Sequence, residues 1–410
     1  MRVAIVKPDH GVTGGFEIVV DQLVAGLRGR GHEVDLVLVD ATVADVSHLP
    51  VAVDSAQLGL FREFFSHLTL INQFEALDVS GYEVVLCTQP GSYAVRHPRK
   101  VVLFYHHARS FYDLFGAIEG SQSTDVELHH LAAFIVRDVD GFYLTQTLPI
   151  LAGSRRIKKR LADHNGLHDN VEVFNAGIDE TFLDQTEPLA FEAPVCIGRH
   201  EFPKRAELFI HAMKHVGGLE GRVVGVGSQT DRLKGLDAWL HVQHMDGSGK
   251  GLPGCPINDD QLWREYASHM PIEELDAARE TVRSRGWEST VRFLGRVSRD
   301  DLLREYRSAL CVVCPAFDED FGLTCIEAMA CGKPVIACHD GGGYVELIED
   351  GVDGFLVEAT GLAIAAAIEA LRDVELARAM GARGRAKAQA FTWDRAIAQV
   401  EQTLKAVGRR

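Results

Sequence analysis

The sequence predicts an α/β protein made of two Rossmann-like domains, each a parallel sheet flanked by helices. Its 410 residues, 46% of them hydrophobic, exceed one ordinary domain and suffice for two sizeable cores. Short apolar runs alternate with segments of helical period, the pattern of repeated strand–helix–strand units. Gly or polar residues follow most of these runs, at the strand end where open α/β sheets bind ligands.

Charge and hydropathy exclude several classes of protein. The formal net charge of −16 disfavours nucleic acids and anionic membranes as main partners. No apolar run reaches the roughly 18 residues that span a bilayer. The start, Met1 to Val6, is strand-like rather than a cleavable signal. We therefore expect a cytoplasmic protein whose eight cysteines stay reduced. The oligomeric state and peripheral membrane contact stay open.

The first domain begins with a strand–helix–strand unit. Val3 to Lys7 and Val34 to Val39 are the expected strands, and Phe16 to Leu27 is the helix between them. The loop before this helix, Gly11-Val-Thr-Gly14-Gly15, departs from the G-x-G-x-x-G pattern of dinucleotide-binding proteins. NAD is therefore not expected.

The remaining strands of this domain are predicted from short apolar runs: Val84 to Thr88, Val101 to Tyr105, Phe142 to Thr145, and Val171 to Phe174. Ser154 should cap a helix that carries five basic residues, Arg155, Arg156, Lys158, Lys159 and Arg160. Such a cluster is typical of a solvated face, and contact with a membrane or an anionic acceptor is the alternative.

A second series of strands follows Glu187 to Pro194, which is the expected linker. The strands of this series are Val195 to Gly198, Val223 to Gly227, Val291 to Leu294, Ala309 to Pro315, and Val335 to Cys338. Ala206 to His215, Ile326 to Cys331, Leu362 to Leu371, and Val374 to Ala388 are the expected helices. The predicted domains are residues 1–187 and 188–390. Cys311-Val-Val-Cys314 has redox or zinc spacing but lacks a second pair, so neither role is expected.

The stretch Phe317 to Glu327, FDEDFGLTCIE, is the strongest functional signal. Glu319 and Glu327 stand before and on a predicted helix, and Phe321-Gly322-Leu323 would place backbone N–H groups at its N-terminus. A helix N-terminus carries unpaired donors and a partial positive charge, so it suits a phosphate. Carboxylates beside such donors suit a ligand with an anionic half and a hydroxyl-rich half, such as a nucleotide-sugar.

This stretch resembles the E-x7-E signature of the retaining glycosyltransferases of family 4, which have the GT-B fold. The match continues through Glu327-Ala-Met-Ala-Cys-Gly-Lys-Pro-Val, Gly342-Gly343 with Glu346, and Asp350-Gly351 with Gly354. The resemblance implies two Rossmann-like domains facing each other across a cleft. It also implies that the closing segment, 391–410, crosses back onto the first domain, and that Asn175 to Asp179 is the interdomain crossover.

The resemblance also assigns roles to individual residues. GRHEFPKRAELFIHA matches a family segment whose Arg and Lys clamp the donor diphosphate, here Arg199 and Lys204, although the Gly often found next is Arg205. Fixed cations there would stabilise the charge that the leaving diphosphate gains. The remaining implied donor contacts are Glu319 with sugar hydroxyls, the Phe321, Gly322, Leu323 and Thr324 turn, Glu327 with the ribose, the Gly14-Gly15 loop, and His106. For the histidine, a slip of one position to His107 and a plain solvated loop both stay open.

The implied reaction is hexosyl transfer from a UDP- or GDP-sugar to an acceptor hydroxyl, with retention of configuration and no cofactor. Asp318-Glu319-Asp320 spells the D-x-D metal motif of a different transferase fold, but Arg199 and Lys204 already supply the charge a metal would, so no metal is expected. Asp320 replaces a Gly usual in the family. An epimerase, a phosphorylase, a pseudo-glycosyltransferase, a sugar-binding protein without catalysis, and transfer to a lipid-linked saccharide are the alternatives.

The expected acceptor is a small sugar or aminocyclitol, neutral or cationic. Between Asp40 and Asp138 there are 12 acidic residues against 6 Lys and Arg, and an acidic domain attracts cations. Compared with the family, about 30 extra residues stand at Gln229 to Asn258 and include a Gly/Pro-rich piece, which we expect to be a mobile flap or an oligomer contact.

Overall fold

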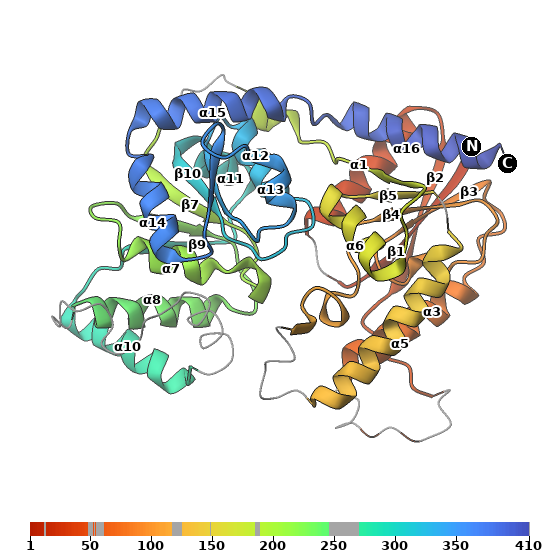
Figure 1. The fold of residues 1–410 in the computed structure, drawn as a ribbon, viewed down its shortest axis with the longest axis horizontal. Helices are drawn as coiled ribbons and strands as arrows, with labels where there is room; N and C mark the ends of the chain where they lie inside the picture. The colour runs from red at the N-terminus through yellow and green to blue at the C-terminus, as the bar shows by residue number, and fades with distance from the viewer. Residues whose placement is uncertain are drawn as a thin grey trace. The chain divides into compact units, whose positions relative to one another are not determined.

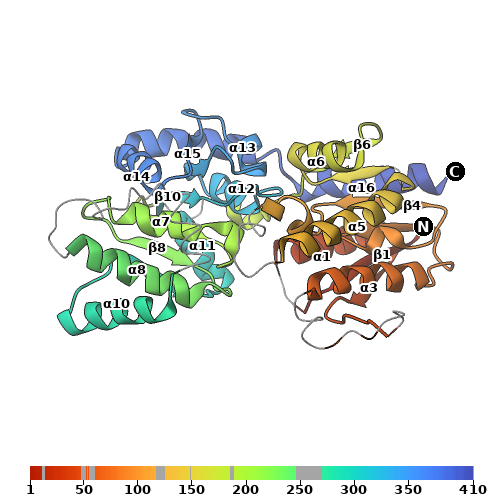
Figure 2. The ribbon, with the colours of Figure 1, turned by 60° about the horizontal axis from the view of Figure 1, so that its bottom comes forward.

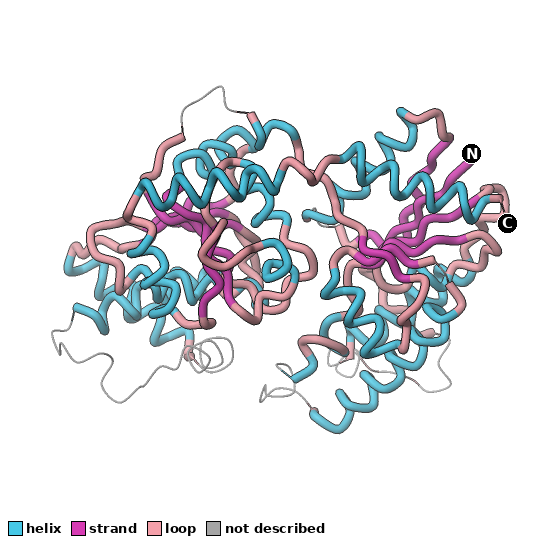
Figure 3. The backbone as a smooth tube through the Cα atoms, turned by 45° about the horizontal axis from the view of Figure 1, so that its top comes forward, coloured by secondary structure: helices cyan, strands magenta, loops and turns pink. Residues whose placement is uncertain are grey.

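The computed structural model describes residues 1–11, 14–47, 52, 54, 61–116, 125–147, 149–184, 189–245 and 270–409. The chain divides into two compact units: Met1–Gly177 with Phe391–Arg410, called the N-terminal unit below, and Ile178–Ala390, the C-terminal unit. Figure 1 shows the elements of each. In each unit, strands lie side by side with helices around them (Figure 3).

The N-terminal unit holds a parallel sheet with strand order β2-β1-β3-β4-β5-β6. Its elements are β1 (Arg2–Asp9), α1 (Gly15–Gly29), β2 (Glu33–Asp40), α3 (Arg62–Ala76), β3 (Val84–Thr88), η1 (Ser92–Ala94), β4 (Lys100–Phe104), η2 (Arg109–Phe111), α5 (Val126–Thr145), β5 (Ile150–Ala152), α6 (Arg155–Asn165), β6 (Val171–Val173) and α16 (Trp393–Gly408). Figure 2 gives a second view of these elements.

The C-terminal unit holds a second parallel sheet with strand order β12-β11-β10-β7-β8-β9. Its elements are η3 (Glu180–Leu183), β7 (Ala193–Ile197), η4 (Phe202–Lys204), α7 (Ala206–Met213), β8 (Gly221–Val224), α8 (Thr230–Met245), α10 (Ile272–Arg285), β9 (Val291–Gly295), α11 (Arg299–Ser308), β10 (Ala309–Cys314), α12 (Leu323–Ala330), β11 (Val335–Cys338), α13 (Gly343–Leu347), β12 (Gly354–Val357), α14 (Gly361–Ala370) and α15 (Val374–Ala388). The two parallel sheets confirm the predicted fold class.

The cores explain why the strands read as continuous apolar runs. Every residue of β3 and β10 is buried, because helices cover both faces of each sheet. The thiols of Cys311 and Cys314 lie inside β10, and burial raises the pKa of both. They therefore pack as small apolar side chains.

Three expectations differ from the structure. Phe142–Thr145 is not a strand but the last turn of α5, a helix that Asp125 caps through the backbone N–H of Leu128. The strand follows five residues later as β5. Helix packing outweighs the strand preference of these side chains. The buried residues of α5 recur at helical spacing: His129, Ala132, Ala133, Val136, Asp140 and Leu144.

The boundary between the units lies at Gly177 and Ile178, inside the predicted crossover segment, rather than at 187 and 188. Ala190 and Glu192, in the predicted linker, donate backbone hydrogen bonds to Arg307 and Ser308, so they already belong to the C-terminal unit. The segment Gln229 to Asn258 is helical over its first part, α8, and the Gly/Pro-rich piece from 246 onward lies outside the described residues.

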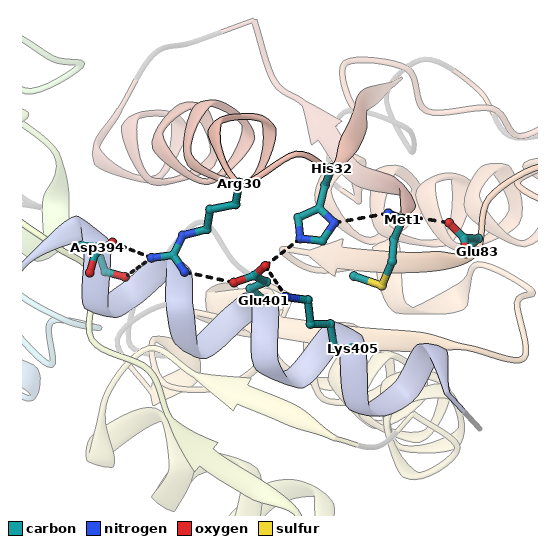
Figure 4. Close-up of polar contacts among 7 residues, drawn as sticks. All are labelled: Met1, Arg30, His32, Glu83, Asp394, Glu401 and Lys405. Atoms are coloured by element: carbon teal, nitrogen blue, oxygen red, sulfur yellow. Dashed lines mark hydrogen bonds and ion pairs between the residues drawn. The ribbon is translucent and has the colours of Figure 1, made fainter.

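The last helix, α16, belongs to the N-terminal unit and packs on α1 and on strands β3 and β4. Glu401 on α16 accepts hydrogen bonds from Arg30 and His32, in the turn between α1 and β2 (Figure 4). In the described part of the chain, no helix is long and apolar enough to cross a membrane.

Candidate active site

Neighbouring parallel strands place the predicted cations and Glu319 at one edge of the C-terminal sheet. β7 and β10 pair in parallel, so the loops that follow them start from the same edge. Arg199 and Lys204 come from the loop after β7, and Glu319 comes from the loop after β10. The Lys204 ammonium donates a hydrogen bond of 2.5 Å to Glu319 Oε2. Arg199 and Lys204 line one pocket together with Gly198, Pro315 and Tyr344.

The Lys204–Glu319 pair is within reach of a ligand. The two side chains are 26% and 16% exposed, and the Arg199 side chain is exposed and has no hydrogen bond or ion pair within the described ranges. A partly exposed ion pair contributes little to stability. An anionic ligand can therefore compete for the ammonium, while hydroxyl groups can donate to the carboxylate that is released.

Two glycines let the Glu319 loop lie close to the loop after β11. Gly342 has φ +61°, and a Cβ there would lie 2.5 Å from the carbonyl oxygen of Glu319. Gly343 donates a 2.6 Å hydrogen bond to that same oxygen. Only residues without a side chain fit this approach, so Gly342-Gly343 fixes the backbone that carries Glu319.

Helix α12 begins directly after this loop, with Gly322 at its N-cap in a left-handed conformation of φ +106°. A Cβ at Gly322 would lie 2.5 Å from the Tyr344 ring, so the helix start packs against α13. Leu323 and Thr324 form the first turn and are half-buried, whereas Phe321 is buried. The first turn of any helix leaves N–H donors unpaired, and here they lie four residues from Glu319.

Glu327, on α12, differs from Glu319 in its surroundings. Its Oε2 accepts a 2.7 Å hydrogen bond from the Tyr306 hydroxyl of α11. Burial raises the pKa of Glu327 to about 7, although the Tyr306 hydroxyl and the nearby Arg299 favour its ionised form. The ribose contact of Glu327 stays a prediction.

The two histidines after β4 have different roles. His107 is 1% exposed, stacks on Tyr112 with ring centroids 4.0 Å apart, and contacts Asn165 Oδ1 through Nε2 at 2.8 Å. Burial lowers the pKa of His107 to about 3, so its ring is neutral. His106 is half-buried, and its Nδ1 lies 2.8 Å from the His107 carbonyl oxygen. Of the two, His106 is the one that a ligand can reach.

A buried polar network lies behind these histidines. Asp140 on α5 has no exposed surface and accepts hydrogen bonds from His67 Nε2 at 2.8 Å, from the Tyr112 hydroxyl at 2.9 Å, and from the Tyr93 hydroxyl. Burial acts to raise the pKa of Asp140, but His67 and these donors outweigh it and hold the pKa below its usual value. Tyr112 thereby connects Asp140 to the ring of His107.

The Gly14-Gly15 loop is held by residues that the sequence did not single out. The Gly14 N–H donates to Glu17 Oε2 at 2.7 Å, and Glu17 Oε1 lies 3.1 Å from the Lys7 ammonium at the end of β1. Phe16 packs edge-on against Tyr105, with ring centroids 4.8 Å apart. This contact places Gly15 beside the loop of His106 in the N-terminal unit.

The predicted site residues thus fall into two groups. Arg199, Lys204, Glu319, Phe321, Gly322, Leu323, Thr324 and Glu327 lie in the C-terminal unit, and Gly14, Gly15 and His106 lie in the N-terminal unit. Their roles with a ligand stay predictions.

Within the D-x-D triplet, Asp318 is 4% exposed, and its N–H donates to the Asp340 carbonyl oxygen. The metal-independent mechanism likewise stays a prediction.

Sequence reasoning did not find Tyr306, Glu17 or the Arg205–Asp340 pair described below. Glu17 carried a local signal, because a Glu three residues after a helix N-cap is a capping residue. Tyr306 and Asp340 carried none, since their partners lie far away in the sequence.

Two family models match the chain. The model described as "Glycosyltransferase Family 4" matches residues 13–182, and "Glycosyl transferases group 1" matches residues 272–387. The first falls almost entirely in the N-terminal unit and the second in the C-terminal unit.

Several relatives carry the name D-inositol 3-phosphate glycosyltransferase. The protein of Mycobacterium sp. (strain JLS) is 38% identical over 383 residues, which are 86% of this chain and 76% of that protein. The protein of Nocardia farcinica is 26% identical over 405 residues, or 95% and 84% of the two chains. The match to the protein of Kineococcus radiotolerans, 38% identical, is confined to 139 residues, 31% of its length.

Solved structures share the fold over the whole chain. Sucrose-phosphate synthase from Thermosynechococcus elongatus is 19% identical with a TM-score of 0.67, covering 99% of this chain and 98% of that one. The Anabaena protein Alr3699/HepE in complex with UDP-glucose is also 19% identical, with a TM-score of 0.63 and coverage of 99% and 100%. These likenesses confirm the GT-B fold.

Proposed function

Because the chain belongs to glycosyltransferase family 4, we propose that it moves a hexosyl group from a nucleoside-diphosphate sugar to a hydroxyl of a small polyol, with retention of configuration and without a metal. The observation that carries this proposal is the Lys204–Glu319 pair beside Arg199 at the carboxyl edge of the C-terminal sheet. A sugar diphosphate has an anionic half for the cations and a hydroxyl-rich half for the carboxylate.

In the proposed reaction the donor diphosphate replaces Glu319 as the partner of the Lys204 ammonium, and it also binds the Arg199 guanidinium. Glu319 then accepts hydrogen bonds from the sugar hydroxyls, and Glu327 Oε1 accepts from the ribose. The bond between the anomeric carbon and the phosphate oxygen breaks, and the negative charge passes to the diphosphate, where the two cations stabilise it.

The acceptor oxygen forms the new bond to the anomeric carbon on the face that the diphosphate leaves. The acceptor proton passes to the leaving phosphate oxygen, so no side-chain carboxylate serves as a nucleophile. His106 is the proposed contact of the N-terminal unit with the donor sugar, since the neighbouring His107 is buried and held by Asn165.

The proposed acceptor is an uncharged or cationic cyclitol or sugar. At the carboxyl edge of the N-terminal sheet, Lys7 is paired with Glu17 at 3.1 Å, and Arg109 with Asp113 at 2.6 Å. Each pair has one nearly buried member, since the Lys7 side chain is 6% and the Asp113 side chain 4% exposed, so these cations are less available to a phosphate than Lys204 is. A phosphorylated cyclitol is the second candidate, because the relatives above are named for D-inositol 3-phosphate.

The experiment is a two-stage screen. UDP-, GDP- and dTDP-sugars are first tested for thermal stabilisation of the protein and for slow release of nucleoside diphosphate without acceptor. The best donor is then offered with inositol, an aminocyclitol and inositol phosphate in the presence of EDTA, and NMR gives the anomeric configuration of the product. Failure of every donor to stabilise the protein or release diphosphate would reject the function, and an inverted product would reject retention.

A further inference from the structure

The residue after Lys204 departs both from the resembling family and from ordinary backbone preference. Arg205 stands where the family often has Gly, and it has φ 48° and ψ 40°, the left-handed conformation. That conformation costs a residue with a side chain on the order of 1 kcal/mol. Strain of this kind persists where the surroundings hold the residue in place. The contacts of the Arg205 side chain show what holds it.

The Arg205 guanidinium is 2% exposed and forms a fork with Asp340. Its two terminal nitrogens donate to the two carboxylate oxygens of Asp340 at 2.8 and 2.5 Å, and its Nε donates to the Pro315 carbonyl oxygen at 2.7 Å. The Phe317 ring lies beneath it, 5.6 Å from centroid to guanidinium carbon. A planar fork with two parallel hydrogen bonds fixes direction as well as distance.

These contacts join three loops of the C-terminal sheet: the one after β7, which carries Arg205, the one after β10, and the one after β11. Backbone hydrogen bonds run between the same loops, from Phe317 to Pro203 at 2.8 Å, from Asp318 to Asp340 at 2.9 Å, and from Glu319 to Gly341 at 3.2 Å. The Arg205 side chain therefore links the backbone segment that carries Lys204 to the one that carries Glu319, and this link is called the strut below.

We infer that Arg205, through its fork with Asp340, is the positioning residue that sets the Lys204 ammonium and the Glu319 carboxylate for the sugar diphosphate. This inference rests on the proposed function. The guanidinium is not itself a ligand of the diphosphate, because it is buried and engaged by Asp340 and Pro315. It acts on the reaction through Lys204, its neighbour in the chain.

The test compares variants of the full chain in transfer from UDP-glucose, or from whichever donor the screen selects. Arg205→Gly removes the strut and keeps the backbone conformation, since Gly adopts a left-handed φ without strain. Arg205→Lys keeps the charge and loses the fork. Asp340→Asn weakens the same fork from the other loop.

The matched control is Arg222→Ala. Arg222 also pairs with two carboxylates, Glu192 at 2.9 Å and Glu305 at 3.2 Å, and donates to Ser308. It stands on β8, and its partners precede β7 and β10, so this network lies at the amino edge of the sheet, away from the site. The control therefore reports the cost of losing an arginine network without the positioning effect.

We expect Arg205→Gly to lower kcat by about 10- to 100-fold with a smaller change in donor KM, because a small misplacement of a charge-stabilising group costs that much. Arg205→Lys should recover little, and Asp340→Asn should lose part of the same effect. In a Lys204→Ala background, Arg205→Gly should lower kcat by less than it does in the parent, because only the Glu319 carboxylate is then left to be positioned. Arg222→Ala should lower Tm and leave kcat within threefold.

Two kinetic results would overturn the inference: folded Arg205→Gly with kcat within threefold of the parent, or losses from Arg205→Gly and Lys204→Ala that multiply. A parent protein that transfers no sugar from any donor would instead reject the proposed function. UDP binding measured by calorimetry would then decide the inference by itself. Arg205→Gly should weaken UDP binding as much as Lys204→Ala does, and unchanged UDP affinity would overturn it.

Discussion

The two sheets differ in how their ionisable side chains are placed. In the N-terminal unit, Asp140 is fully buried and holds three donors that lie behind the loop of His106. In the C-terminal unit, Glu319 is 16% exposed and holds one ammonium, Lys204, at the carboxyl edge. A buried carboxylate cannot exchange its partners for a ligand without leaving them unpaired, whereas a partly exposed one can. The first arrangement supports a loop, and the second is available for chemistry.

The largest effect expected from this comparison is on stability. Asp140→Ala leaves two tyrosine hydroxyls and an imidazole without their buried acceptor, which should cost about 3 to 5 kcal/mol of unfolding free energy. Urea denaturation of the full chain measures it. Turnover per folded molecule should change much less.

Asp138→Ala is the control, because Asp138 is an exposed aspartate on the same helix. It should shift the unfolding free energy by less than about 0.5 kcal/mol. An Asp140→Ala protein as stable as the Asp138→Ala protein would show that the buried network does not support the fold.

The reverse pattern, a large loss of turnover with little loss of stability, is expected for Arg199 and Lys204. Arg199→Ala and Lys204→Ala should each lower turnover by about 100- to 1000-fold while leaving the fold stable, since in the proposed reaction each cation stabilises the leaving diphosphate. Arg199→Lys should recover part of the loss, because an ammonium lacks the planar fork. Steady-state kinetics with the best donor measures both losses, and Arg283→Ala, which changes an exposed side chain of α10, is the control.

The double variant Arg199→Ala with Lys204→Ala should lose less turnover than the product of the single losses, because the proposed reaction has both cations acting on one leaving group. Turnover within threefold of the parent for either single variant would show that the diphosphate binds elsewhere. The C-terminal sheet would then not differ from the N-terminal sheet in carrying the reaction.

A smaller, pH-dependent effect distinguishes the two glutamates of the site. The folded pKa of Glu327, about 7, lies above its ordinary value of 4.5, mainly because of burial. As pH rises from 4.5 to 7, the unfolded chain loses this proton first, so stability falls over that window. Glu327→Gln removes the effect and should be more stable than the parent by on the order of 1 to 3 kcal/mol at pH 8.

Denaturant melts between pH 5 and pH 8 measure this difference, which should shrink toward the acid end. Glu319→Gln is the comparison, because it gives up the ion pair with Lys204 and should gain no stability at pH 8. Equal pH profiles for Glu327→Gln and the parent would contradict the account of Glu327. The donor KM of Glu327→Gln separately tests the ribose contact.

Much of the fold could be predicted because buried strands and helices show recognisable apolar patterns in the sequence. Val84–Thr88 and Val374–Ala388 have the predicted bounds, since a continuous apolar run and an Asp373 cap mark them. Helix α8 was not predicted, although Leu233, Leu236 and Leu240 are buried at helical spacing. The Gly/Pro-rich residues after it concealed this pattern.

The site could be predicted in part for a topological reason. Arg199 and Lys204 follow one strand and Glu319 follows its neighbour, so parallel pairing brings their loops together. The Arg205–Asp340 fork joins residues 135 positions apart, and no local pattern predicts which carboxylate a buried arginine will meet. Likewise, only the packing of Tyr112 and Asn165 shows that His107 is internal and His106 is not.

The smallest expected effect concerns a third placement, an ion-pair cluster at the amino edge of the N-terminal sheet, where Arg30 and His32 precede β2. Glu401 on α16 is 13% exposed and accepts from Lys405 at 2.5 Å, His32 at 2.9 Å and Arg30 at 3.0 Å (Figure 4). These partners, Lys405 first, lower the pKa of Glu401 to about 2. Its stabilisation is therefore complete above the ordinary value of 4.5 and is lost as pH falls toward 2. Glu401→Gln should lower the unfolding free energy by about 1 kcal/mol at pH 7, and by less at pH 4.

Asp394→Asn, which changes a 90% exposed partner of Arg30, should lower the unfolding free energy by less than Glu401→Gln does at either pH. Thermal melts of the three proteins at both pH values decide it, and a Glu401→Gln loss no larger than the Asp394→Asn loss would mean that apolar packing alone holds α16.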